Sequence, residues 1–263
     1  MIRFLGQSRM MMQAAGCVLA GALAIGMSGC TRHAPDAPAM PTVSRSDGHL
    51  TAHPGKPRQF CTPGERPLGL GAGRDGILFV PETTPPGAKL PLVLLLHGAG
   101  GAASGVLPLM RERAARDGFI LLAPDSRDRT WDLVVGGGFG ADVPFINQAL
   151  EQVFGQCAID PNHLAIAGFS DGASYALTLG LTNGNLFSHV MAFSPGFMQL
   201  QEVRGKPSIF VSHGTRDPVL PHSHTRHMVD ELEAAGYSVR FRDFDGGHRA
   251  PPEMVAAALR WFR

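Results

Sequence analysis

A serine between two glycines is the feature of this sequence that most directly suggests chemistry. The segment Gly168-Phe169-Ser170-Asp171-Gly172 has the form G-x-S-x-G, which is weak evidence by itself. Its context strengthens it, because an apolar run typical of a strand precedes it and a helical pattern follows. A sharp strand-to-helix turn exposes its serine hydroxyl and needs small residues on both sides. We therefore predict that Ser170 is a nucleophile; an ordinary serine in a tight turn is the alternative.

A serine hydroxyl needs a base to activate it, and the base needs a carboxylate to orient it. Of the 11 histidines, His248 is the best candidate, because it follows the last apolar strand and two glycines. Asp217 is the best candidate for the acid, because it follows its own strand and lies between the serine and the histidine in the chain. Asp243 and Asp245 are rivals for the acid, but both lie at the strand end that carries His248.

Two backbone N–H groups near the serine are expected to stabilise a negatively charged oxygen on the substrate. One belongs to Asp171, directly after the serine. The other is expected at Ala99, in a glycine-rich loop after the apolar run at residues 92–96. His97 is expected to brace this loop rather than to act as the base. The alternative is that the loop is a plain β-turn.

A second loop is expected to form one wall of the site. Residues 125–140 are rich in glycine and contain Trp131, which we expect to contact the substrate. The alternative is a surface loop held by a buried tryptophan.

Strand and helix patterns alternate through the second half of the chain. Apolar runs typical of strands lie at residues 92–96, 119–123, 164–167, 190–193, 209–211 and 239–244. Helical patterns lie at residues 106–116, 143–154, 172–182, 224–235 and 253–262. This alternation predicts an α/β domain with a mostly parallel sheet and helices on both faces. Functional residues in such sheets gather at the carboxyl ends of the strands, where the predicted serine, aspartate and histidine all lie.

Several stretches together resemble the α/β-hydrolase superfamily, specifically its phospholipase/carboxylesterase and polyhydroxybutyrate-depolymerase-like esterases. The resemblance runs from about residue 76 to the end and is carried by residues 94–98, 142–146, 159–161, 168–172, 213–218 and 246–248. It implies the α/β-hydrolase fold, hydrolysis of esters or thioesters without a cofactor, and a triad of Ser170, Asp217 and His248. The short segment between residues 193 and 209 implies that no large cap domain covers the site. Asp171 departs from the residue usual in relatives, so the resemblance does not fix the substrate.

Composition excludes some other functions. The chain of 263 residues has 23 Lys and Arg against 22 Asp and Glu, which gives no argument for a nucleic-acid partner. His224 and His227 have helical spacing, but no cysteine or carboxylate completes a metal-binding set, so we expect no metal. The expected partner is a small-molecule or polymeric ester. The alternatives are an acyltransferase or a peptidase with the same triad, or a non-catalytic binding lipoprotein.

The N-terminus has the pattern of an export signal. Arg3 and Arg9 precede an apolar run of small residues that ends at Ser28-Gly29-Cys30. This predicts a signal peptide over residues 1–29 and a lipid on Cys30, although Met27 departs from the usual leucine and ordinary cleavage is the alternative. The protein would then be a periplasm-facing lipoprotein, held at the membrane only by its lipid, or a secreted protein.

A flexible tether rich in proline is expected over residues 30–58, before a domain over residues 59–263. Two cysteines remain in that domain, Cys61 and Cys157. In an oxidising compartment an even pair predicts one disulfide; two unrelated buried thiols are the alternative.

The lipid anchor gives a first prediction. Replacing Cys30 by serine should move the protein from the membrane fraction to the soluble fraction, because stable anchoring needs the acyl chains that the thiol would carry. Fractionation followed by immunoblotting measures this, with Cys17→Ser as the matched control that stays anchored. Equal solubility of wild type and Cys30→Ser would leave simple secretion.

Overall fold

A computed structural model describes residues 46–57, 61–71, 73–82, 87–200 and 202–263. These residues belong to one compact unit, Thr42–Arg263. The predicted signal peptide, Cys30 and the first part of the predicted tether lie outside the described residues. In the part that is described, no helix combines the length and apolarity needed to cross a bilayer.

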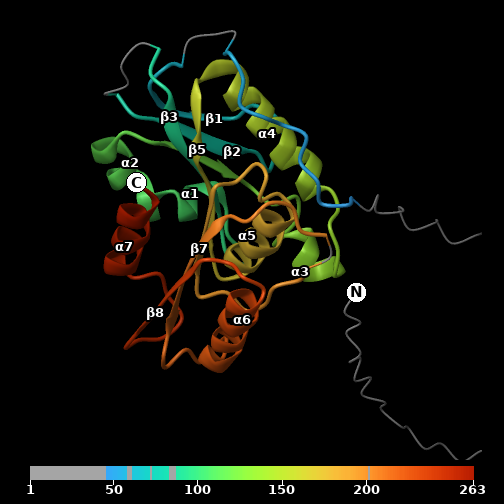
Figure 1. Cartoon of the computed structure of the whole chain (residues 1–263). Helices are drawn as coiled ribbons and strands as arrows, with labels where there is room; N and C mark the ends of the chain where they lie inside the picture. Colours follow the sequence, from blue (N-terminus) through green and yellow to red (C-terminus); the bar gives the residue numbers. More distant parts are fainter. Residues whose placement is uncertain (1–45, 58–60, 72, 83–86, 201) are drawn as a thin grey trace, which may run out of the picture. The chain divides into compact units, whose positions relative to one another are not determined.

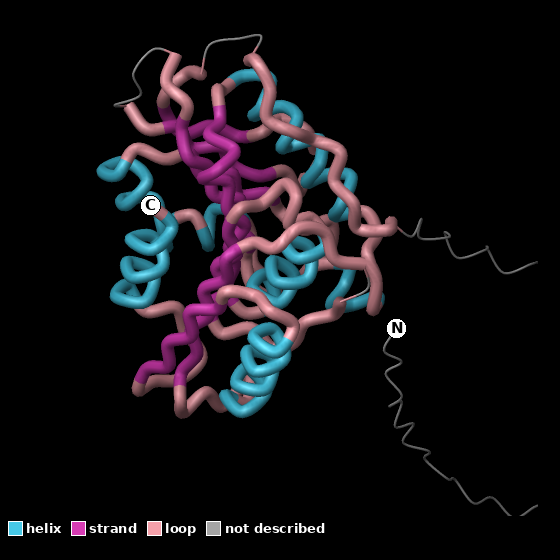
Figure 2. The backbone as a smooth tube through the Cα atoms, viewed as in Figure 1, coloured by secondary structure: helices cyan, strands magenta, loops and turns pink. Residues whose placement is uncertain are grey.

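One sheet forms the centre of this unit (Figures 1 and 2). In the described residues it has eight strands in the order β1-β2-β4-β3-β5-β6-β7-β8. The strands from β3 to β8 pair in parallel, whereas β1 and β2 add an antiparallel edge. Their bounds are β1 Gly64–Pro67, β2 Gly76–Val80, β3 Leu90–Leu96, β4 Ile120–Pro124, β5 Ile159–Phe169, β6 His189–Phe193, β7 Ser208–Gly214 and β8 Val239–Phe244.

Helices cover both faces of the sheet (Figure 2). Helices α1, α2 and α7 lie on one face, and α3, α4, α5 and α6 lie on the other (Figure 1). Their bounds are α1 Ala103–Val106, α2 Pro108–Asp117, α3 Asp132–Gly136, α4 Asp142–Gln156, α5 Asp171–Thr182, α6 His222–Ala234 and α7 Pro252–Phe262.

The two-sided covering explains why the central strands are continuously apolar. Successive side chains of a strand point to opposite faces. In β3, Leu92 and Leu94 therefore enter the core shared with α4 and α5, while Val93 and Leu95 enter the core shared with α2 and α7. All four are fully buried. These observations confirm the predicted α/β fold and all six predicted strands.

The differences from the predicted elements have local causes. Strand β1 has the sequence Gly-Glu-Arg-Pro, without the β-branched or aromatic side chains typical of strands, so it shows no strand pattern. The helix expected over residues 106–116 is two helices, because Pro108 starts α2 after the break at Leu107. Helix α3 is a short helix inside the loop expected over residues 125–140.

The segment of residues 46–57, expected to be part of the tether, packs against the domain. Leu50 and Ala52 are buried. Asn183 accepts a hydrogen bond from Leu50 N–H at 2.8 Å and donates one to Gly48 O at 2.8 Å. Asn147 Oδ1 accepts the N–H of Ala52 at 2.9 Å. Two apolar side chains are too few to show a period, so the sequence placed the start of the folded domain too late.

Cys61 and Cys157 are joined by a disulfide, with their Cα atoms 4.5 Å apart. Cys61 precedes β1, and Cys157 directly follows α4 and precedes β5. The bond therefore holds the first strand of the sheet to the amino end of β5, whereas Ser170 follows the carboxyl end of that strand.

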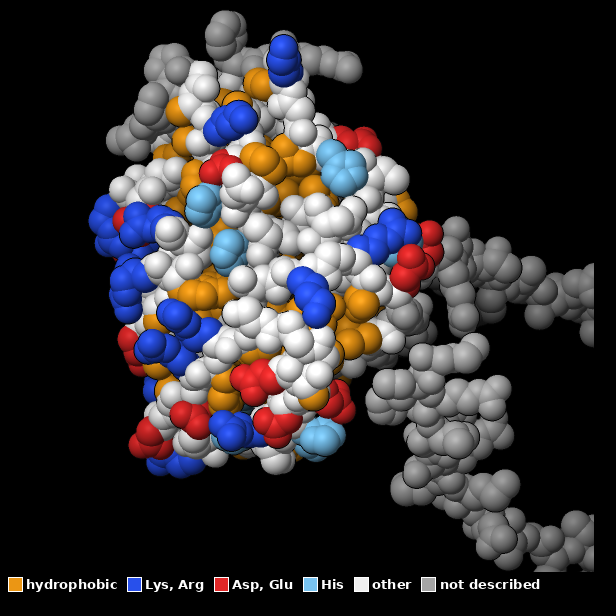
Figure 3. All heavy atoms as spheres, in the orientation of Figure 1, with side chains coloured by type: hydrophobic (Ala, Val, Ile, Leu, Met, Phe, Trp, Pro, Cys, Tyr) orange, Lys and Arg blue, Asp and Glu red, His pale blue; other side chains and the backbone are white. Residues whose placement is uncertain are grey.

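Charge is mixed on the surface of the molecule. On the face drawn in Figure 3, basic and acidic side chains are interspersed among neutral and apolar ones, without a continuous basic stripe.

The disulfide gives a second prediction. It spans a sequence separation of 96 residues, and closing such a loop contributes about 4–5 kcal/mol in the chain-entropy model. The double variant Cys61→Ala/Cys157→Ala should melt at a lower temperature in calorimetry. Its activity at 25 °C should stay close to wild type, because the bond and the serine lie at opposite ends of β5. An unchanged melting temperature would contradict the structural role of the bond.

Candidate active site

Ser170 occupies the turn between β5 and α5 in a strained conformation, with φ 57° and ψ −122°. The turn is possible because both flanking positions are glycine. A Cβ at Gly168 would overlap the backbone of Gly172, and a Cβ at Gly172 would overlap the carbonyl of Leu96 on β3. Strained conformations of this kind cluster at functional sites, and this one aims the hydroxyl away from the sheet.

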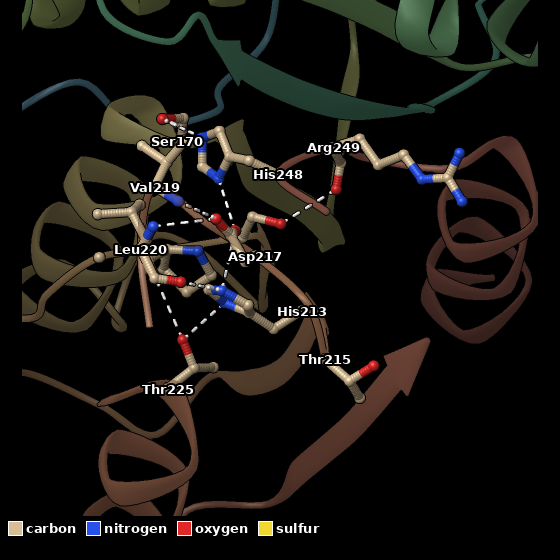
Figure 4. Close-up of polar contacts among 12 residues, drawn as sticks. Ser170, His213, Thr215, Asp217, Val219, Leu220, Thr225, His248 and Arg249 are labelled. Atoms are coloured by element: carbon tan, nitrogen blue, oxygen red, sulfur yellow. Dashed lines mark hydrogen bonds and ion pairs between the residues drawn. The ribbon is translucent and has the colours of Figure 1, made fainter. Parts of the chain in front are cut away.

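His248 lies within hydrogen-bond distance of both expected partners (Figure 4). Its Nε2 is 2.8 Å from Ser170 Oγ, and its Nδ1 is 2.7 Å from Asp217 Oδ2. With Nδ1 protonated, the imidazole donates to the carboxylate and accepts the serine hydroxyl proton. The Phe169 ring packs beside the imidazole, with ring centroids 5.0 Å apart.

The loops that carry Asp217 and His248 are fastened to each other. The N–H of Thr215 donates to Phe244 O, and that of Arg216 donates to Gly246 O, both at 2.9 Å. Ser194, which follows β6 with φ 52°, donates its hydroxyl to the carbonyl of Arg249 at 3.0 Å. The residue after His248 is therefore tied to a third strand end.

The Asp217 carboxylate is fully buried and well supplied with donors. Its Oδ1 accepts the N–H groups of Val219 at 2.8 Å and Leu220 at 2.9 Å, while Oδ2 faces His248. Burial alone would raise the pKa of Asp217. The hydrogen bonds from Leu220, His248 and Val219 outweigh burial and hold that pKa below its ordinary value. The group therefore remains a carboxylate.

The two rival acids point elsewhere. The side chain of Asp245 is 80% exposed and pairs with Arg216 at 2.7 Å. That of Asp243 is 52% exposed and lies 3.7 Å from His222. Among the three aspartates, only Asp217 contacts His248 in the structure.

The two expected oxyanion donors belong to segments that lie next to Ser170. Asp171 is the first residue of α5, so its N–H has no acceptor within the helix. The loop that carries Ala99 lies against the serine, because a Cβ on Gly98 would be only 3.3 Å from Ser170 Cβ.

His97 braces this loop, as predicted. Its Nδ1–H donates to Gly98 O at 2.8 Å, and its Nε2 accepts the N–H of Ser126 at 3.0 Å. Burial lowers the pKa of His97, which favours this neutral form.

Arg74 donates to Gly101 O at 2.8 Å and to the carbonyl of Ser126. No sequence pattern singles out Arg74, because it lies in a glycine-rich segment before the antiparallel strand β2.

Trp131 does not line the substrate site, which corrects our expectation. Its side chain is fully buried. Its Nε1–H donates to His97 O at 2.8 Å, and its ring packs between those of His97 and Tyr175. The tryptophan is thus the buried anchor that the sequence left as the alternative, and it holds the start of the glycine-rich loop that carries Ala99.

The loop around Trp131 does line a cavity of about 480 Å³. Its walls include Thr130, Val135 and Phe139. The hydroxyl of Thr130 donates to Asp171 Oδ2 at 2.7 Å, which ties this loop to the first residue of α5. A smaller cavity of about 230 Å³ lies beside Ala99, and Val106 and Phe169 are among the residues that bound it.

In this loop, the carboxylates of Asp132 and Asp142 each accept the backbone N–H of the other residue. Asp142 Oδ2 accepts the N–H of Asp132 at 2.7 Å, and Asp132 Oδ2 accepts the N–H of Asp142 at 2.8 Å. Asp142 also accepts the N–H of Arg127. Burial, together with the nearby charge of Asp132, raises the pKa of Asp142 from its ordinary value near 3.8 to about 6.

The two histidines with helical spacing do not form a metal site in the described part of the chain. In the ranges that the structure describes, no three His, Cys, Asp or Glu side chains cluster in a way that could hold a metal ion. His224 and His227 lie on α6, where His227 pairs with Glu231 at 3.2 Å.

Comparisons with known proteins find esterases and a thioesterase that are similar to this chain. A model of the phospholipase/carboxylesterase family matches residues 138–263. A probable feruloyl esterase C from Aspergillus terreus is 24% identical over 221 residues, which cover 71% of this chain and 80% of that protein. An acyl-protein thioesterase 1 from Neurospora crassa is 31% identical over 109 residues, which cover 38% of this chain and 44% of that protein. The crystal structure of esterase PE8 superposes with a TM-score of 0.59 at 24% identity, covering 72% of this chain and 97% of that one.

The Asp132–Asp142 pair gives a third prediction. Because the folded pKa of Asp142 is raised, its stabilising contribution is complete below about pH 4 and is lost as the pH rises through 6. The loss amounts to about 3 kcal/mol. The free energy of unfolding of Asp142→Asn minus that of wild type, measured in urea, should therefore rise by this amount between pH 4 and pH 7.5. Asp128→Asn, which removes an exposed carboxylate of the same loop, is the control variant, and parallel curves for the two variants would contradict the raised pKa of Asp142.

Proposed function

We propose that this chain, a carboxylic ester hydrolase with the α/β-hydrolase fold, works through an acyl-enzyme intermediate on Ser170. The observation that carries the proposal is the continuous line of hydrogen bonds from Ser170 Oγ through His248 to Asp217. Nucleophile, base and orienting acid occupy the same relative places in other serine hydrolases.

In the proposed reaction, Ser170 Oγ attacks the acyl carbon of the ester while His248 Nε2 takes the hydroxyl proton. The negative charge that develops on the carbonyl oxygen is stabilised by the N–H groups of Asp171 and Ala99. As the tetrahedral intermediate collapses, His248 returns the proton to the leaving alcohol, and the acyl group stays on the serine. A water molecule, deprotonated by the same histidine, then releases the acid.

Two electrostatic features support these steps. Asp217 stays ionised, so the imidazolium that forms on His248 gains a buried counter-ion 2.7 Å away. Ser170 precedes the first turn of α5, where the helix dipole favours negative charge. The chemistry needs no cofactor, because each proton and electron pair is handled by the side chains and the water.

The smaller cavity, of about 230 Å³, is lined by Gly98, Ala99 and Phe169 beside the serine and would take a short part of the substrate. The larger cavity, of about 480 Å³, is lined by residues 127–142 and touches the site through Thr130, which is bonded to Asp171, so it is a candidate for a bulkier part. The named activities of the two relatives, feruloyl ester and acyl-protein thioester hydrolysis, extend the candidates from esters to thioesters. An acyltransferase or a peptidase with the same triad would differ in the acceptor or in the bond cleaved. A binding lipoprotein would not need the strained serine.

We also propose export to an oxidising compartment. The N-terminal pattern of residues 1–30 and the Cys61–Cys157 disulfide support it independently, because such bonds persist outside the reducing cytosol.

A pair of variants tests the proposed mechanism. Ser170→Ala should lose labelling by a fluorophosphonate probe, and its kcat on p-nitrophenyl esters should fall by roughly 10³-fold or more, because covalent catalysis is lost. Asp217→Asn should lower kcat by a comparable factor while the probe still reacts slowly, because His248 loses its orienting carboxylate.

Asp243→Asn is the matched control for the acid and should retain wild-type kcat. Circular dichroism and melting temperature show whether each variant is folded. Full activity of folded Ser170→Ala, or a loss in Asp243→Asn equal to that in Asp217→Asn, would refute the assignment. A panel of p-nitrophenyl, feruloyl and thioester substrates then ranks the candidates.

A further inference from the structure

A second histidine lies behind the carboxylate of the proposed triad (Figure 4). His213 lies at the carboxyl end of β7 and is fully buried. Its Nε2 lies 2.9 Å from Leu220 O and 3.1 Å from Asp217 Oδ2, while its Nδ1 lies 2.8 Å from Thr225 Oγ1. It therefore contacts two residues, Asp217 and Leu220, of the loop between β7 and α6.

The chemistry of the neighbours decides which nitrogen of His213 carries the proton. Leu220 O and Asp217 Oδ2 can only accept, so Nε2 must be protonated to avoid facing two acceptors with a lone pair. The Thr225 hydroxyl can donate as well as accept. In the structure it can donate to Pro195 O at 3.1 Å, and by turning the same proton toward the nearer Nδ1, at 2.8 Å, it satisfies an unprotonated nitrogen.

The surroundings favour the neutral ring over the imidazolium. Burial lowers the pKa of His213, against the opposing effects of Leu220 O and Asp217. Two more histidines lie near it: His222 on α6, with ring centroids 5.8 Å apart, and His248. A positive charge on either imidazole would disfavour a positive charge on His213. The remaining charged neighbour is Asp243, its register partner on β8, and this carboxylate is turned toward His222.

We propose that His213 is a positioning residue for the hydrolytic triad, holding the Asp217 carboxylate and the Leu220 carbonyl with a single neutral Nε2–H. The proposal rests on the function proposed for Asp217. The Oδ1 atom of Asp217 is fixed by two backbone N–H groups, whereas the polar contacts of Oδ2 within the described residues are to His248 and His213. His213 thus touches the same oxygen on which the base depends.

This role has a consequence that packing alone would not produce. The positive end of the Nε2–H dipole draws charge from Oδ2 and so weakens its hold on the protonated form of His248. Without it, the carboxylate is a stronger acceptor and a less well oriented one. The imidazolium of His248 becomes more favourable, so the pH at which kcat/KM falls on the acid side should move upward.

Two substitutions at His213 separate hydrogen bonding from packing. His213→Leu removes the donor, and we expect kcat to fall about tenfold and the acid limb of kcat/KM to move up by roughly half to one pH unit. His213→Gln places an amide nitrogen close to the former Nε2, and should return both values most of the way to wild type. His227→Gln is the matched control: it changes an exposed imidazole on α6 that pairs with Glu231, and should leave both values unchanged.

The proposal fails if folded His213→Leu keeps the wild-type pH profile while its activity still requires Ser170. It fails equally if His213→Gln is as impaired as His213→Leu. If instead the wild type shows no Ser170-dependent hydrolysis, the proposed function has failed and not the role of His213.

A measurement on the wild type keeps the test decisive if His213→Leu does not fold. Long-range ¹H–¹⁵N NMR spectra, with His213 assigned by its absence in His213→Gln, report which ring nitrogen is protonated. We expect the neutral Nε2–H form throughout the range in which the activity rises with pH. A bare Nε2, or an imidazolium over that range, would overturn the proposal.

Discussion

The strained backbone of Ser170 is the constraint on which the rest of the site depends. A residue with φ 57° and ψ −122° is unfavourable by itself, and it persists because the packing around it leaves no alternative. Helix α5, which begins at the next residue, is buried along most of its length between the sheet and the surrounding helices. The glycines at 168 and 172 let this helix approach β5 and β3 so closely that any side chain there would overlap backbone. Folding energy spread over the core thus fixes one hydroxyl in place.

Parallel strand order then brings the partners of this serine to the same edge. Strands β5, β6, β7 and β8 are consecutive neighbours, and their carboxyl ends carry Ser170, Ser194, Asp217 and His248 in turn. Each following loop is tied to the next by backbone or hydroxyl hydrogen bonds. Because the loops hold one another, the imidazole meets the serine and the carboxylate without long flexible connections, which is the preorganisation that catalysis by hydrogen-bonded groups requires.

Burial separates the charged groups of the site by role. Asp217 is buried but surrounded by donors, so it stays ionised. Asp142 is buried beside another carboxylate, so its pKa rises. His97 and His213 are both buried and neutral, and each uses one N–H to hold a loop next to the serine. Burial disfavours a charge on each of these groups. The hydrogen-bond partners then decide whether the group stays charged, as at Asp217, or neutral, as at His97 and His213.

The sequence by itself determined the α/β fold and the six central strands, because strands buried on both faces must be continuously apolar. It also identified Ser170, Asp217 and His248 as candidates, because such residues meet in the turns after parallel strands, and a serine between two glycines in such a turn is typical of a nucleophile.

The features that the sequence left undecided depended on contacts between distant segments. Only the tertiary structure decided that Trp131 is buried under the oxyanion loop rather than exposed to substrate, since a tryptophan in a glycine-rich loop has the same local pattern in both cases. Likewise, the packing of residues 46–57 on the domain depends on Asn147 and Asn183, which lie far along the chain and whose side chains carry no signal until the fold places them there.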